Sequence, residues 1–260
     1  MNCVKMKLVK GMAVGFLAGW LLAGCSSGYS LVGVEGGRIA ITDKYDRNTD
    51  PEALSILKPY QQKVDSIMKP VIGHSARALS AYRPESPLSN WIADVLRQSA
   101  VRAIGKPADV AVMNMGGIRN AMPEGEITYG TIYEIAPFEN ALCILTMDGA
   151  TLKELFAEIA SVHGEGLSGA ALQIDEEGNL LDAKVNGRPV EEKKVYTVAT
   201  IDYLAEGNDR MMAFRKAQSK TFPKDALLRG LLLDAVKQCE QKGQFVSAQV
   251  EGRIKVSASN

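Results

Sequence analysis

Residues 114–119 read Asn-Met-Gly-Gly-Ile-Arg and combine groups that suit a bound ligand. The two glycines leave room for a ligand against the main chain, because they carry no side chain. Arg119 presents a planar guanidinium whose five N–H donors match a phosphate or a carboxylate. The same residues are also consistent with a tight turn after a strand, with the arginine in solvent. Composition alone leaves both interpretations open.

Two further clusters carry aromatic and polar side chains. Residues 137–140 read Pro-Phe-Glu-Asn, and residues 203–209 read Tyr-Leu-Ala-Glu-Gly-Asn-Asp. The Phe138 ring can stack on a base, and the Asn140 amide can hydrogen-bond the edge of a base. In the alternative interpretation Phe138 is buried, Tyr203 is a core strand residue, and Asp209 caps a turn.

In this order, the motifs closely resemble the C-terminal, substrate-recognition domain of the 5'-nucleotidase family. The family patterns Asn-x-Gly-Gly-Ile-Arg, Gly-x-Ile-Thr and Pro-Phe-x-Asn correspond to residues 114–119, 125–128 and 137–140. Residues 203–209 are similar to its aromatic-x-x-x-Gly-Gly-Asp element. The resemblance extends over residues 60–256. It implies an α/β (α+β) fold, a layered sandwich of mixed sheets flanked by helices.

The resemblance also implies a role for each substrate-binding residue. Phe138 and Tyr203 would clamp the base of a nucleoside or nucleotide, and Asp209 would accept hydrogen bonds from the ribose hydroxyls. The other implied contacts are Arg119 and Arg83 on phosphate, Asn114 on sugar or phosphate, Asn140 on the base edge, and Gly164 where the ligand approaches the backbone. Arg83 departs from the family spacing by one residue, so a solvated loop position is its alternative.

The catalytic half of the family is not expected in this sequence. Hydrolysis there requires two divalent metals, held by Asp-x-His and Asn-His-Asp motifs in an N-terminal domain. His74 and His163 are the two histidines of this sequence, and neither lies in such a motif. We therefore expect no catalytic residue, metal or cofactor in this chain. We expect a separate metallophosphatase chain to supply the divalent metals and the catalytic residues. The alternative is an autonomous nucleoside- or nucleotide-binding lipoprotein without catalysis.

The N-terminus has the pattern of an export signal. Lys5, Lys7 and Lys10 precede an apolar run at residues 12–22, and Leu-Ala-Gly-Cys occupies residues 22–25. This pattern predicts a lipoprotein signal peptide at residues 1–24 and a lipidated Cys25 that anchors an exported, periplasm-facing bacterial protein to the membrane. An ordinary signal peptide is the alternative. We expect a tether at residues 25–50, with a short strand at 38–42, and the 5'-nucleotidase C-terminal-like domain at residues 51–260.

Charge and cysteine content narrow the remaining functions. Thirty basic and thirty acidic residues balance to a formal charge of zero, and the basic residues do not cluster. This argues against a nucleic-acid polymer as partner, although not against a single nucleotide. After removal of Cys3 and lipidation of Cys25, Cys143 and Cys239 are expected to be buried thiols rather than a disulfide.

Apolar spacing predicts the elements that must position these residues. We expect helices at 51–69, from Pro87 after a Ser86 cap, at 128–135, after a Thr151–Glu154 capping box, and at 227–241. Strands are expected at 108–113, 141–147, 171–174, 180–185, 195–201 and 249–256, with a turn at 148–149.

Overall fold

The computed structural model describes residues 31–47 and 49–257, so the predicted signal peptide and Cys25 lie outside the described residues. The chain divides into two units, Met1–Ala53 and Leu54–Asn260. In the described part of the first unit, the only regular element before Pro51 is the 3-10 helix η1 (Asp43–Tyr45). The strand predicted at 38–42 is therefore wrong: these residues are exposed and pair with no described strand, and a strand needs a partner to form.

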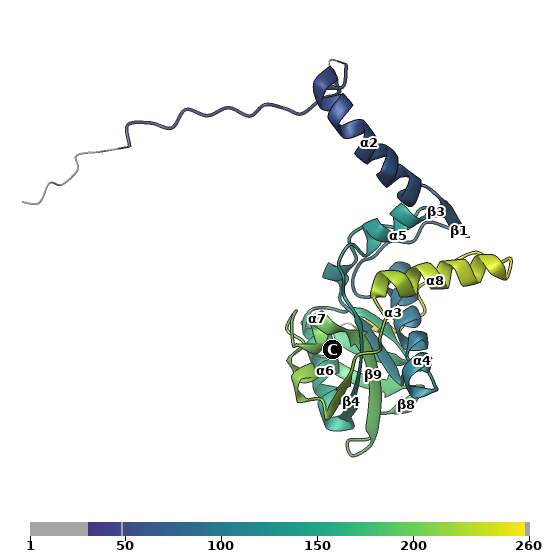
Figure 1. Cartoon of the computed structure of the whole chain (residues 1–260). Helices are drawn as coiled ribbons and strands as arrows, with labels where there is room; N and C mark the ends of the chain where they lie inside the picture. Colours follow the sequence, from purple (N-terminus) through teal and green to yellow (C-terminus); the bar gives the residue numbers. More distant parts are fainter. Residues whose placement is uncertain (1–30, 48, 258–260) are drawn as a thin grey trace, which may run out of the picture. The chain divides into compact units, whose positions relative to one another are not determined.

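A five-stranded sheet forms the centre of the second unit (Figure 1). Its order is β10-β4-β9-β2-β5, and its strands are β2 (Val110–Met113), β4 (Leu142–Asp148), β5 (Gly166–Ser168), β9 (Val195–Ile201) and β10 (Ser219–Thr221). Strands β2 and β9 are parallel, and the other neighbours are antiparallel. All four residues of β2 are buried, which explains why its sequence is a continuous apolar run.

Two smaller sheets complete the β structure. A four-stranded sheet has the order β11-β6-β7-β8, formed by β6 (Ala170–Asp175), β7 (Leu180–Val185), β8 (Arg188–Pro189) and β11 (Ile254–Ser257). In β6 buried and exposed residues alternate, so only one face of this strand meets the core. A two-stranded sheet pairs β1 (Val71–Ser75) with β3 (Gly125–Thr128). The mixed sheets and their helices confirm the predicted fold class.

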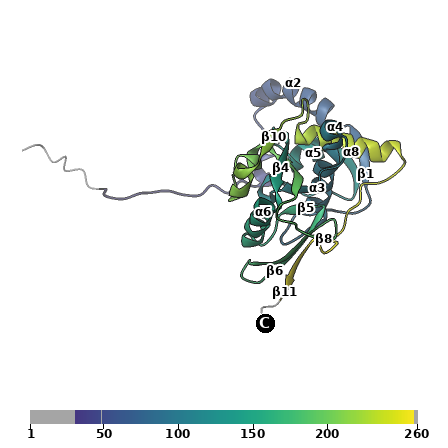
Figure 2. The same ribbon diagram turned by 90° about the horizontal axis from the view of Figure 1, so that it is seen from below.

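The described residues form seven α-helices, several of which pack on the sheets (Figures 1 and 2). They are α2 (Pro51–Met68), α3 (Pro87–Ser99), α4 (Val101–Ile104), α5 (Tyr129–Ile135), α6 (Gly149–Ser161), α7 (Asp202–Ala205) and α8 (Leu228–Gln241), with 3-10 helices η2 (Met115–Gly117) and η3 (Met212–Lys216). Helix α3 packs on β2, β5 and β9, α6 packs on β4 and β9, and α8 packs on α3 and β1. Within the described residues, no helix is both long and apolar enough to cross a bilayer.

Helix starts show where local patterns predict well and where they do not. Thr128 caps α5 and forms a reciprocal capping box with Thr131, so the helix predicted at 128–135 is confirmed. The start predicted for α6 is wrong, because Asp148 rather than Thr151 is its N-cap and the Asp148 carboxylate accepts from the Thr151 N–H at 2.8 Å. A carboxylate three residues ahead of an N–H satisfies that donor directly. Residues 148–149 consequently open a helix instead of forming a turn.

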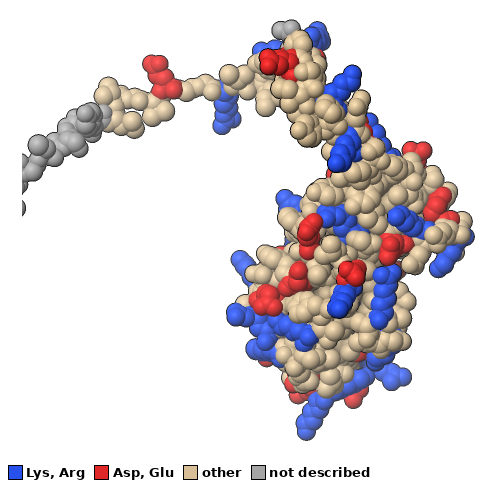
Figure 3. All heavy atoms as spheres, in the orientation of Figure 1, with Lys and Arg blue, Asp and Glu red and all other residues tan. Residues whose placement is uncertain are grey.

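On the face of the second unit shown in Figure 3, acidic and basic side chains are interspersed rather than gathered into one patch. Cys143 is a buried free thiol in β4, and Cys239 is a half-buried free thiol in α8. The final strand is shorter than predicted, since β11 begins only at Ile254.

Candidate functional site

A pocket of about 360 Å³ brings together five of the eight predicted substrate-binding residues. Its lining comes from three separate segments and consists of Asn114, Gly116, Gly117, Phe138, Asn140, Tyr203 and Asp209. Asn114 and Asp209 are 95 positions apart in the sequence. The pocket therefore depends on tertiary structure, and no local turn could build it.

The central sheet explains why these segments meet. Because β2 and β9 are parallel neighbours, in the register Val110 to Val198, both strands end at the same edge of the sheet. Asn114 follows β2, and Tyr203 lies in α7 directly after β9. Strand β4 runs antiparallel to β9, with Leu142 opposite Ile201, so the segment that leads into β4 arrives at the same edge. Ligands of open α/β sheets bind at this carboxyl edge.

Asp209 links two walls of the pocket through its carboxylate. Nδ2 of Asn114 donates to Oδ2 of Asp209 at 2.6 Å, and the Tyr203 hydroxyl donates to Oδ1 at 2.9 Å. The bonded carboxylate raises the pKa of Tyr203, because it stabilises the protonated phenol. Asp209 and Arg210 both have positive φ, 53° and 67°, a conformation that costs free energy in residues other than glycine.

The Asn114 side chain leaves a hydrogen-bond acceptor without a partner. Asn114 is 4 % exposed, and its Oδ1 atom is buried and has no hydrogen-bond partner among the described residues. A buried acceptor without a donor costs about 1–3 kcal/mol. Gly117 lies against this amide, since a Cβ there would come within 2.7 Å of the same oxygen.

The two aromatic rings present open surface to the pocket. Phe138 is 50 % exposed and Tyr203 is 42 % exposed, so neither is a core residue as the alternative interpretation proposed. A planar ligand that covers them would remove apolar surface from water and gain ring stacking.

Arg229 of α8 holds the segment that carries Phe138. Its Nη1 atom donates to the Pro137 carbonyl at 3.1 Å, and its guanidinium lies 4.5 Å from the centre of the Tyr133 ring. The neighbouring N–H of Leu228 donates to the Asn140 carbonyl at 2.8 Å. Sequence reasoning missed Arg229, because the apolar pattern of α8 does not indicate what the Arg229 side chain contacts.

Arg119, Arg83 and Gly164 are not among the residues that line this pocket. Arg119 is exposed and donates to the carbonyl of the lining residue Gly116 at 3.1 Å. Arg83 forms an ion pair with the buried Glu165. Gly164 packs against the Pro84 backbone, where an added Cβ would lie 2.2 Å from the carbonyl oxygen. The need for glycine at position 164 thus arises from chain packing, whereas the sequence pattern suggested ligand approach.

The polar groups of the pocket fit an organic ligand better than a metal ion. One carboxylate and two amides line it, and no group of three or more metal-ligating side chains occurs among the described residues. His74 is 3.1 Å from Glu240 and packs on Phe245.

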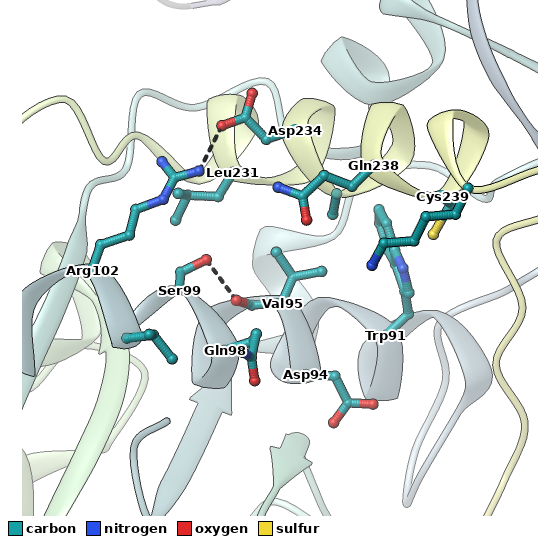
Figure 4. Close-up of a pocket in the computed structure, with 13 residues that line it drawn as sticks. Trp91, Asp94, Val95, Gln98, Ser99, Arg102, Leu231, Asp234, Gln238 and Cys239 are labelled. Atoms are coloured by element: carbon teal, nitrogen blue, oxygen red, sulfur yellow. Dashed lines mark hydrogen bonds and ion pairs between the residues drawn. The ribbon is translucent and has the colours of Figure 1, made fainter. Parts of the chain in front are cut away.

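A larger hollow of about 460 Å³ lies between α3 and α8 (Figure 4). Trp91 and Val95 of α3 and Leu231 of α8 line it. An ion pair between Arg102 and Asp234 at 3.0 Å lies at one end. None of the predicted binding residues lines it. Size alone does not make it a site, and the pocket at the sheet edge has the convergent polar groups.

Comparison with known proteins identifies the family. The model of the "5'-nucleotidase, C-terminal domain" family matches residues 71–216, more than half of the chain. This chain belongs to that family. The match contains all eight predicted binding residues, from Arg83 to Asp209, and confirms the resemblance seen in the motifs.

Two curated relatives are much longer than this chain. Endonuclease YhcR of Bacillus subtilis is 33% identical over 175 residues, which cover 64% of this chain and 14% of YhcR. Silent protein UshA(0) of Salmonella typhimurium is 30% identical over 179 residues, 66% of this chain and 32% of that protein. The chain therefore spans less than a third of each of these two relatives.

A solved structure supports the fold of the C-terminal domain. The 5'-nucleotidase precursor from Thermus thermophilus matches with a TM-score of 0.69 and 26% identity, over 79% of this chain and 43% of that one. The NAD nucleotidase of Haemophilus influenzae has a TM-score of 0.59 at 19% identity, which supports the fold alone.

Proposed function

We propose that the pocket at the end of β2 and β9 binds the nucleoside part of a nucleotide. The observation that carries this proposal is the convergence of Asn114, Phe138, Asn140, Tyr203 and Asp209 on one cavity. Two half-exposed rings suit a base, an acidic side chain suits the ribose hydroxyls, and the free Asn114 oxygen requires a donor. Arg119, beside the pocket, would hold the phosphate.

In this proposal the domain is the nucleotide-recognition part of a 5'-nucleotidase-type phosphohydrolase active in nucleotide catabolism. A separate metallophosphatase chain would supply the divalent metals and activate the attacking water. Export and lipidation at Cys25 would place the domain at the membrane, facing the periplasm. The purified chain alone should then leave AMP intact in manganese, and turnover that a chelator abolishes would refute the division between two chains.

A second candidate is a binding lipoprotein that captures nucleosides without chemistry. The ion pair between Arg83 and Glu165 favours it, because a guanidinium bound to a buried carboxylate is less available to a phosphate. The two candidates differ in a measurable way. A phosphohydrolase subunit should prefer AMP to adenosine, and a nucleoside-binding protein should not.

Calorimetric titration with adenosine and AMP tests the proposed site. Phe138→Ala and Tyr203→Ala should each weaken both ligands by about 1–3 kcal/mol, because each removes one stacking surface. The double variant should lose no more than the sum, since one ring alone cannot sandwich a base. Phe222→Ala is the matched control: Phe222 is 51 % exposed, as Phe138 is, but lies outside the pocket.

The phosphate contact is tested separately with Arg119→Ala. This variant should weaken AMP and leave adenosine nearly unchanged, because only AMP carries the phosphate. The exposed Arg188 supplies the control variant Arg188→Ala, which should change neither. Equal losses for both ligands in Arg119→Ala would show that this arginine supports the loop and not the phosphate. Normal binding by the Phe138 and Tyr203 variants would refute the pocket itself.

A further inference from the structure

Glu165 is a buried carboxylate beside the pocket that sequence reasoning did not identify. It is 3 % exposed and lies directly before β5. One of its oxygens accepts from Nη2 of Arg83, and the other accepts from the backbone N–H of Met115. Buried glutamates are rare in proteins, because an ionised carboxylate loses its hydration there and needs partners to compensate.

The strand register explains why Glu165 reaches the pocket loop. Strand β5 pairs antiparallel to β2, with Gly166 opposite Met113. Glu165 therefore lies opposite the point where the chain leaves β2 and enters η2. Met115, whose N–H it binds, stands between the lining residues Asn114 and Gly116.

Burial makes the ionised form of Glu165 costly. Burial is the largest cause of its raised pKa, and the negative charge of Asp209 raises it further, against the opposing effects of Met115 and Arg83. A folded-state pKa above the unfolded value means that the protonated form stabilises the fold. That contribution is lost as pH rises through the folded pKa, and above it the ionised carboxylate lowers stability.

We propose that Glu165 is the positioning residue of this pocket: its carboxylate fixes the Asn114–Gly117 loop through Met115 and holds Arg83 against that loop. The inference rests on the proposed function, that the pocket binds a nucleoside or nucleotide. A residue that costs stability and orders a binding loop has the signature of a functional rather than a structural group.

The variant Glu165→Gln tests whether Glu165 positions the binding loop or only stabilises the fold. Its amide oxygen still accepts from Met115, and Arg83, with a side chain 41% exposed, remains hydrated when the ion pair is lost. Thermal stability above the folded pKa of Glu165 should be unchanged or higher, because the variant carries no buried charge. The affinity for adenosine should fall by about tenfold, because the loop loses the Arg83 ion pair and the Met115 N–H then bonds to a neutral amide in place of a charged carboxylate.

Glu85 provides a matched control. It is also 3 % exposed, and its carboxylate accepts from Asn90, Glu251 and Ile254, away from the pocket lining. Glu85→Gln should therefore lower the thermal stability and leave the dissociation constant of the folded protein for adenosine unchanged. A loss of stability in Glu165→Gln equal to that in Glu85→Gln would overturn the positioning role.

NMR spectroscopy of the ligand-free protein tests the contact between the Glu165 carboxylate and the Met115 amide. The Met115 amide proton shift should titrate with pH in the wild type, with a midpoint above that of an ordinary glutamate, and should be flat in Glu165→Gln. A flat Met115 shift in the wild type refutes the inference. If the wild type binds neither adenosine nor AMP, the proposed function fails. If the wild type binds and Glu165→Gln binds equally well, only the positioning role fails.

Discussion

Replacing Gly164 by alanine separates two reasons for a glycine beside the site. The family resemblance suggests that Gly164 lets a ligand approach the backbone. In the structure its φ is 108°, and a Cβ would lie 2.2 Å from the Pro84 carbonyl oxygen and 2.8 Å from the Pro84 Cα. Both atoms belong to the backbone, so no side chain can rotate to make room.

Gly105 gives the reference for the conformational part of this cost. It ends α4 with a φ of 73°, and no atom lies within 4 Å of an added Cβ. Gly105→Ala should cost about 1 kcal/mol, because the left-handed conformation is strained for alanine. Gly164→Ala carries a similar strain together with an overlap worth about 1–3 kcal/mol. The lower chain entropy of unfolded alanine affects both variants equally.

The expected difference between the two variants is therefore about 2 kcal/mol, which corresponds to a melting temperature roughly 4–8 °C lower for Gly164→Ala in a domain of this size. Differential scanning calorimetry measures it, and titration with adenosine follows on the folded variants. If Gly164→Ala has the same melting temperature as Gly105→Ala and loses only ligand affinity, Gly164 is needed for ligand approach. The packing argument is then refuted.

Two further predictions concern the cysteines. Burial raises the pKa of Cys143 to about 11 from its ordinary value of 9.0, so the thiol should resist alkylation at about pH 9 while the half-buried Cys239 reacts. Because the folded pKa is the higher one, this thiol's contribution to stability is complete below pH 9.0 and lost as pH rises through about 11; equal alkylation rates for the two cysteines in the native protein would contradict this. Cys25→Ala should release the protein from the membrane fraction, because acyl chains on Cys25 would be its anchor; a variant that still sediments with membranes, in cells lacking the partner chain, would refute lipidation at Cys25.

The elements that the sequence predicts well are those with a strong local pattern. The β2 strand is an uninterrupted apolar run, and α5 carries its cap at Thr128. Prediction fails where two local signals compete. Asp148 and Thr151 are both good N-cap residues, and only the end of β4 decides that Asp148 takes the role. The strand predicted at 38–42 had suitable residues and lacked a partner strand.

The site shows the same division at the level of single residues. Motif order indicated Asn114, Phe138 and Asp209, because glycine turns, an aromatic ring and an acidic side chain leave a visible pattern. Glu165 and Arg229 leave none, since a glutamate or an arginine is ordinary in a loop or on a helix. Their importance comes from burial and from partners that lie 50 and 92 positions away in the sequence. Such contacts are set by strand register and helix packing.

Three costly features of this domain lie at or beside the pocket and support ligand binding there, whereas the unpaired Oδ1 of Asn90 and the buried Glu85 lie away from its lining. Asn114 has an unpaired buried oxygen, Asp209 has a left-handed backbone, and Glu165 is a buried charge. Each costs stability, and Asn114 and Asp209 bond to each other directly while Glu165 holds the residue next to Asn114. A turn that served only to connect β2 to β3 would need none of them. The fully buried strand β2 tolerates these costs because its core packing offsets them, and a ligand that donates hydrogen bonds to Asp209 would offset a further part of them.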